Sequence, residues 1–128
     1  MDIYMYKKDY FKESSNVKKA LLQAVDCLYK RINAYELQGI AFNKIYNDDY
    51  IKYDKHGQFY TFKAQKENIQ LRILYTYMII DGNPIVLIAD YIIKKKNKKD
   101  YINRFDTVNN ANPVDMFEKS KFVNSISV

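Results

Sequence analysis

Arg72 lies inside the apolar run IQLRILYTYMII of residues 69–80, and its side chain is suited to holding a phosphate group. A guanidinium offers a planar fork of hydrogen-bond donors and stays charged when it is partly removed from water. Because the chain contains only three arginines, we interpret an arginine in a hydrophobic strand as functional. The structural alternative is an ion pair between Arg72 and an acid such as Asp90 on the neighbouring strand.

Basic and aromatic residues accompany Arg72 in the sequence. Lys63 lies on the preceding predicted strand, and Tyr91 and Tyr101 flank a run of five lysines that follows the last predicted strand. Cations that hold phosphates, interleaved with rings that stack on bases, are typical of single-stranded RNA binding. A solvated surface is the alternative, although lysines at the beginning of a helix oppose its dipole. We predict that Lys63, Arg72 and the first of these lysines meet on one concave surface. The run comprises Lys94, Lys95, Lys96, Lys98 and Lys99.

Periodic apolar residues predict the elements that position these side chains. Residues 16–32 have the spacing of an amphipathic helix, with Ser14, Ser15 or Asn16 available as its N-cap. Alternation in residues 69–80 places Arg72 on the face opposite the most apolar row. We predict an α+β fold in which an N-terminal helix or helices pack on a mainly antiparallel four-stranded sheet, followed by a C-terminal helix that Pro113 ends. Residues 1–112 would form this single domain, and residues 113–128 a C-terminal tail.

Composition narrows the class of protein. A net charge of +6 favours a polyanionic or acidic partner. Cys27 is the only cysteine, and no Cys/His ligand set is present, so we expect neither a disulfide nor a metal or other cofactor. His56, the only histidine, is interpreted as an exposed turn residue without a chemical role. With no signal-peptide pattern and no apolar stretch long enough to span a membrane, we expect a cytoplasmic protein that does not bind membranes.

Residues 59–105 resemble the C-terminal half of the RelE/HigB-like toxins of bacterial type II toxin–antitoxin systems, including their phage-derived relatives. The resemblance lies in the order of the motifs: a strand with a central arginine in LRILY, the DGNP turn, the strand IVLIADYII, and a lysine-rich segment that opens an amphipathic helix. It covers a little over a third of the chain. It implies a RelE-like fold and a toxin that cleaves mRNA without a metal, often on the ribosome, until an acidic antitoxin protein silences it.

The resemblance also implies roles for individual residues. RNA cleavage needs a base for the 2′-hydroxyl proton, cations for the phosphate and an acid for the leaving 5′-oxygen. By position in the family pattern, Arg72 would clamp the phosphate, Lys63 matches a strand lysine of some members, and Tyr101 is the best tyrosine candidate. We take these three as candidate catalytic residues. The candidate RNA-binding residues are Tyr91 and the lysine run, of which residues 94–96 match the family's basic segment.

The chain departs from the family in its last predicted strand. LIADYII has Asp90 and Tyr91 where relatives often have His, Gly and Phe, so the general base is unassigned. ParE-like proteins of similar architecture target DNA gyrase and are not nucleases. We therefore expect an mRNA endoribonuclease toxin, with a non-catalytic ParE-like protein, or an accessory module that docks on an acidic protein, as the alternatives.

Overall fold

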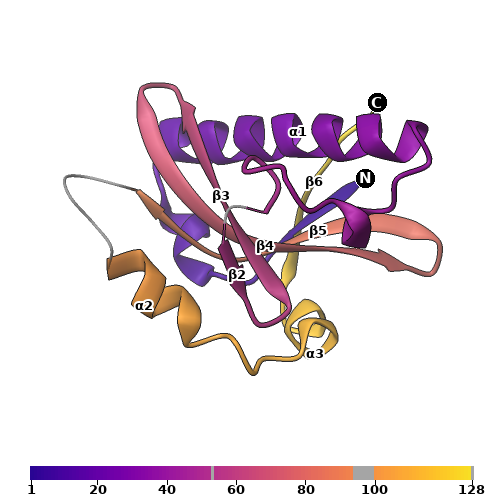
Figure 1. Cartoon of the computed structure of the whole chain (residues 1–128). Coiled ribbons are helices and arrows are strands. Elements are labelled where there is room, and N and C mark those ends of the chain that lie inside the picture. The colour runs from indigo at the N-terminus through magenta and orange to yellow at the C-terminus, as the bar shows by residue number, and fades with distance from the viewer. Residues whose placement is uncertain (53, 94–99, 128) are drawn as a thin grey trace.

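The computed structural model describes residues 1–52, 54–93 and 100–127 of the chain (Figure 1). The described residues form a central sheet with helices on both sides. In chain order the elements are β1 (Asp2–Met5), the 3-10 helix η1 (Lys8–Lys12), α1 (Ser15–Leu37), the 3-10 helix η2 (Phe42–Lys44), β2 (Asp54–His56), β3 (Phe59–Lys66), β4 (Ile69–Ile80), β5 (Asn83–Ile93), α2 (Asp100–Asp106), α3 (Pro113–Glu118) and β6 (Lys121–Ser125).

The prediction of a mainly antiparallel four-stranded sheet is wrong. The sheet has six strands in the order β2-β3-β4-β5-β1-β6 and is mixed, because β1 runs parallel to β5 whereas the other neighbours are antiparallel. β1 has only four residues, and periodicity in so short a strand does not specify its partner. β6 carries no alternation of buried and exposed residues that would have marked it as a strand. The RelE-like architecture expected from the resemblance, with its four-stranded antiparallel sheet, is therefore wrong.

The expected single C-terminal helix is also wrong. α2 ends at Asp106, and Pro113 begins α3 instead of ending a helix. Proline is well tolerated there, because its missing N–H would have no helical partner at the first position. The side chain of Asn112 caps α3 by accepting hydrogen bonds from the backbone of the next two non-proline residues. Residues 113–128, separated above as a tail, thus provide α3 and β6, which pairs with β1.

The predicted N-terminal helix is confirmed and extends to Leu37. Ser14 is its N-cap, with Oγ accepting a hydrogen bond from the Val17 backbone N–H at 3.4 Å. One face of α1 is buried against the sheet, where it meets the apolar row of β4 that includes Leu71 and Ile73. The buried residues of α1 are Ala20, Leu21, Ala24, Val25, Leu28, Tyr29 and Ile32.

The opposite face of the sheet is covered by α2 and α3 (Figure 1). There Phe59 and Leu74 pack with Phe105 of α2 and Met116 of α3. Side chains alternate between the faces of a strand, so Arg72, two residues before Leu74, lies on this α2 side of the sheet. The site residues predicted around Arg72 must therefore be sought on the face that α1 does not cover.

The turn between β2 and β3 packs against the segment after α2. Gly57 has a φ of +64°, and a Cβ at this position would lie 2.0 Å from the carbonyl oxygen of Asn109. The neighbouring His56 is 3% exposed, and its Nδ1 lies 2.5 Å from Oδ1 of Asp106. The interpretation of His56 as an exposed residue is therefore wrong, because its ring attaches the end of α2 to the sheet.

Within the described residues, no helix is both long enough and apolar enough to cross a membrane.

Candidate functional site

Lys63 and Arg72 lie opposite each other on the α2 side of the sheet. They are register partners on the antiparallel strands β3 and β4. Residues in this relation have Cβ atoms about 4.5–5.5 Å apart, so two basic side chains at these positions can reach one anion together. The structure thus brings together two of the predicted catalytic residues in a pair suited to phosphate.

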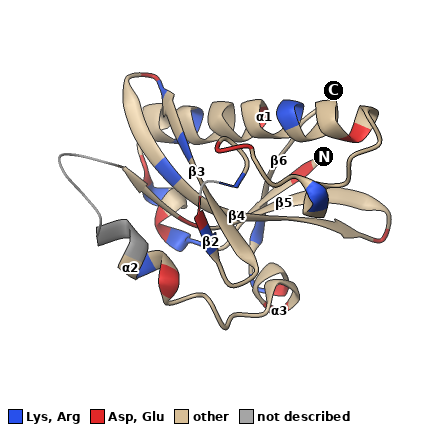
Figure 2. Ribbon diagram, in the orientation of Figure 1, with Lys and Arg blue, Asp and Glu red and all other residues tan. Residues whose placement is uncertain are grey.

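The pair lines an open hollow of about 450 Å³ at the outer edge of β3. This edge is accessible because β2 pairs only with the beginning of β3, at residues 59–61. Figure 2 shows basic positions on both strands of the β3–β4 hairpin. A hollow of this size falls within the range of small-molecule sites and can admit one nucleotide. Its other polar lining residues are Asp49, Tyr50, Gln65 and Gln70.

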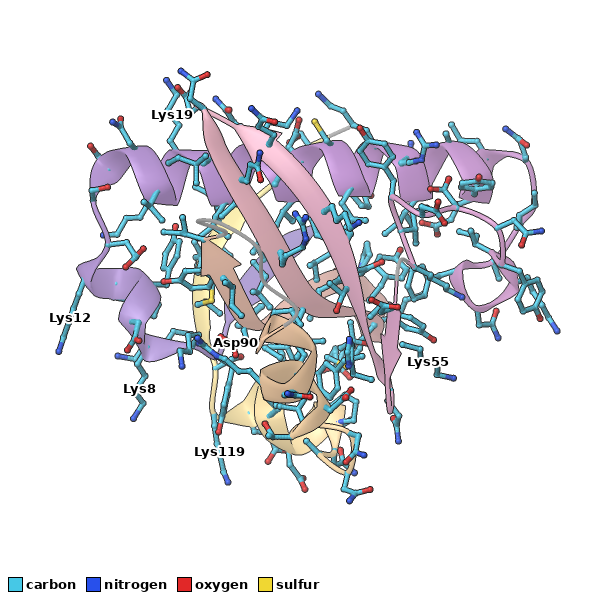
Figure 3. The ribbon with its side chains drawn as sticks, turned by 60° about the vertical axis from the view of Figure 1, so that its left-hand side comes forward. Lys8, Lys12, Lys19, Lys55, Asp90 and Lys119 are labelled. Atoms are coloured by element: carbon cyan, nitrogen blue, oxygen red, sulfur yellow. The ribbon has the colours of Figure 1, made fainter. Side chains whose placement is uncertain are left out.

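Arg72 is 7% exposed, and its Nη1 donates a hydrogen bond to the carbonyl oxygen of Leu71 at 3.0 Å. Asp90, the acid considered as its structural partner, forms a bidentate pair with Arg104 of α2. Nε and Nη2 of Arg104 each lie 2.7 Å from a carboxylate oxygen. Nζ of Lys7 lies 4.0 Å from Oδ1 of Asp90. Figure 3 shows Asp90 on the side of the sheet where α2 packs. Asp90 therefore anchors α2 to β5.

Tyr91 is not brought to this hollow. Its register partner on β4 is Ile73, which lies on the α1 side, and its ring is 6% exposed. Burial and then the nearby carboxylates of Glu13 and Asp9 raise the pKa of its hydroxyl, so the phenol stays protonated at neutral pH. Tyr91 is thus a core residue that does not line the surface around Arg72.

The basic run follows directly on the strand beside Arg72. The partner of Arg72 on β5 is Ile92, and β5 ends one residue later, at Ile93. The residues predicted to contact RNA there, Lys94, Lys95, Lys96, Lys98 and Lys99, lie outside the described residues. Tyr101 belongs to the first turn of α2, and its side chain is also outside the described part of the chain.

A hydrogen-bond network holds the loop that forms one wall of the hollow. Asp48 is 4% exposed and accepts from Nε of Arg31 at 2.7 and 2.9 Å, from the hydroxyl of Tyr35 at 2.7 Å and from the backbone N–H of Tyr50 at 3.0 Å. Burial alone would raise the pKa of Asp48, but the hydrogen bonds from Tyr35 and Arg31 outweigh it and hold the pKa below its usual value. An ionised carboxylate therefore fixes Tyr50 in place at neutral pH.

Asp49 and Tyr50 were not among the site residues predicted from the sequence. Both lie in the run YNDDY of residues 46–50, which has neither strand nor helix periodicity. A chain with 13 tyrosines gives little weight to any one of them. The usable signal was Asp48 itself, because an aspartate in a turn often accepts a hydrogen bond from the backbone N–H two residues on, which here is that of Tyr50.

A second basic surface lies beyond the opposite end of the sheet. Lys7, Lys8 and Lys119 line a hollow of about 390 Å³ between η1 and the segment that joins α3 to β6. Figure 3 shows Lys8, Lys12 and Lys119 projecting outward on this side. The exposed ring of Phe11 lies close by on η1, and Nζ of Lys121 is 5.6 Å from its centroid. This surface combines positive charge with aromatic groups, and none of the predicted site residues that the structure describes belongs to it.

Comparisons of the chain with protein-family models, with curated proteins and with solved structures found no match.

Proposed function

We propose that this protein is a RelE/HigB-like toxin of a type II toxin–antitoxin system, which binds mRNA and cleaves it with its own side chains, without a metal. The observation that supports this most directly is the opposed pair of Lys63 and Arg72 in an open polar hollow. Two cations on neighbouring strands can contact one phosphate together, and RNA supplies a phosphate at each nucleotide. The order of motifs in residues 59–105 supplies the resemblance to the toxins.

The reaction proposed for the hollow is attack of a ribose 2′-hydroxyl on the adjacent phosphorus. The bond from phosphorus to the 5′-oxygen breaks, leaving a 2′,3′-cyclic phosphate and a 5′-hydroxyl. Arg72 and Lys63 stabilise the negative charge that grows on the phosphate oxygens. Asp49 is the carboxylate among the described lining residues, and we assign it as the base that takes the 2′-hydroxyl proton. Tyr101 was predicted from the sequence only as a candidate catalytic residue, and we propose that its hydroxyl gives the proton to the 5′-oxygen.

The proposed substrate implies partners and a compartment. A toxin of this kind would meet mRNA and the ribosome in the cytoplasm and would be held inactive by an acidic antitoxin. The net charge of +6 supports an anionic partner, whether RNA or an acidic antitoxin. The lysine run after Ile93 is proposed to extend the phosphate contacts beyond the hollow.

Expression in a bacterial host tests the proposal. Wild-type protein should arrest growth, and Arg72→Ala and Lys63→Ala should relieve the arrest at equal soluble yield. Lys55→Ala is the matched control, because Lys55 is an exposed lysine on β2 whose partner Tyr60 packs toward the α1 side. If cells that contain soluble wild-type protein grow as fast as cells that do not express it, the toxin proposal is refuted.

The second candidate is a non-catalytic module of ParE-like or accessory type that binds a protein. The near-complete burial of Arg72 favours it, because a residue that is 7% exposed contacts a substrate less readily than an open one. The surface of Lys7, Lys8 and Lys119 also suits an acidic protein. Growth arrest that persists in Arg72→Ala and disappears when these three lysines are changed to glutamine would favour this candidate.

A further inference from the structure

Tyr50 stands between two hollows at the edge of β3. On the α2 side it lines the hollow of about 450 Å³ that contains Lys63 and Arg72. On the α1 side it lines a second hollow of about 590 Å³, whose basic lining residues are Lys30, Arg31 and Lys66. An exposed aromatic ring therefore has cations on both sides of it along one continuous surface.

The ring of Tyr50 is held in place although it is 57% exposed. The guanidinium carbon of Arg31 lies 4.8 Å from the ring centroid, within the range of a cation–π contact. Arg31 is itself fixed by Asp48, which also accepts a hydrogen bond from the backbone N–H of Tyr50. Because the ring is ordered before any ligand arrives, a ligand that stacks on it loses little affinity to ordering.

We propose that Tyr50 is a stacking platform for one base of single-stranded RNA where the strand crosses the edge of β3. The phosphate on one side of this base would lie in the hollow of Lys63 and Arg72, and the next phosphate would lie toward Lys66. Interleaved rings and cations of this kind bind single-stranded nucleic acid without reading its sequence. The inference rests on the proposed function and adds to it the path of the substrate.

Binding of two oligomers by fluorescence anisotropy tests the platform. One is an oligouridylate of about ten nucleotides, and the other has the same number of ribose phosphates but no bases. Tyr50→Leu should weaken binding of the oligouridylate by about 10-fold or more, because one base loses its stacking partner. The dependence on salt should not change, since the phosphate contacts remain, and the abasic oligomer should bind to wild type and variant alike.

Two matched variants complete the design. Tyr50→Phe keeps the ring and should bind as the wild type does. Tyr46→Leu removes a tyrosine that is 71% exposed and lines neither of the two hollows among the described residues, so it should also bind normally. Circular dichroism of all variants checks that the fold is retained.

The outcomes separate this inference from the proposed function. If Tyr50→Leu binds the oligouridylate as the wild type does while Arg72→Ala binds it weakly, the platform is wrong and the RNA-binding hollow stands. Equal weakening of both oligomers by Tyr50→Leu would also overturn the platform, because the ring would then act through the shape of the loop. If the wild type binds neither oligomer at low salt, the platform is wrong, whereas the proposed function fails only if the folded wild type also cleaves no mRNA with or without translating ribosomes.

Discussion

Replacing Asp48 by asparagine should loosen the loop that presents Tyr50. The substitution keeps the shape of the side chain but removes the charge that pairs with Nε of Arg31 at 2.7 Å. Breaking a buried ion pair costs about 3–5 kcal/mol, and hydrogen bonds to charged groups contribute about 1.5–3 kcal/mol. The side chain of Arg31 is 48% exposed and can regain water, which lowers the cost. We therefore expect Asp48→Asn to lower the free energy of unfolding by about 2 kcal/mol.

Urea denaturation as a function of pH checks this reasoning. The folded-state pKa of Asp48 lies below its usual value, so its contribution to stability is complete above the pKa of the unfolded chain, about 3.9. That contribution is lost as the pH falls through the lower folded-state pKa. The difference between wild type and Asp48→Asn should therefore be constant from pH 7 to about pH 5 and narrow below about pH 4. A difference under about 0.5 kcal/mol at pH 7 would refute the role assigned to this carboxylate.

Two other substitutions test the packing of the α2 side by the same urea denaturation. Gly57→Ala should lower the free energy of unfolding by about 3 kcal/mol or more, because the alanine must adopt a positive φ and its Cβ meets the Asn109 carbonyl. Its control is Gly82→Ala, which has a φ of +80° and no atom within 4 Å of the added Cβ, and which should lower it by about 1–2 kcal/mol. Equal costs would show that the β2–β3 turn does not press on the segment after α2. Arg104→Met should cost about 2–3 kcal/mol, because Asp90 loses both bonds of its bidentate pair, and a neutral result would show that Asp90 is satisfied without α2.

The elements with strong periodicity were predictable from the sequence. The α1 stripe follows from apolar spacing, with Ser14 as one of three candidate N-caps, and the β3–β4–β5 meander follows from alternation and turn residues. The order of these strands was enough to place Lys63 beside Arg72. The parallel pairing of β1 and the edge strand β6 were not predictable, because both are short and their partners are far away in sequence.

The rest of the candidate site depends on tertiary contacts. Tyr50 belongs to the hollow because Asp48, Arg31 and Tyr35 fix a loop without secondary structure, and no local pattern encodes that network. His56 was assigned to the surface because a turn usually is exposed, but the segment after α2 covers it. Tyr91 was assigned to RNA because it precedes the lysines, but alternation along β5 directs it into the core on the α1 side.

Cleavage of a labelled mRNA by the purified protein, with and without translating ribosomes, tests the central claim most directly. The wild type should produce fragments that end in a 2′,3′-cyclic phosphate. Arg72→Ala should cleave about 100-fold more slowly or worse, as expected when a preorganised cation is removed from the transition state. Circular dichroism and urea denaturation must show that this variant is folded, because Arg72 is largely buried. Cleavage by folded Arg72→Ala at the wild-type rate, or no cleavage by folded wild type under either condition, would contradict the account.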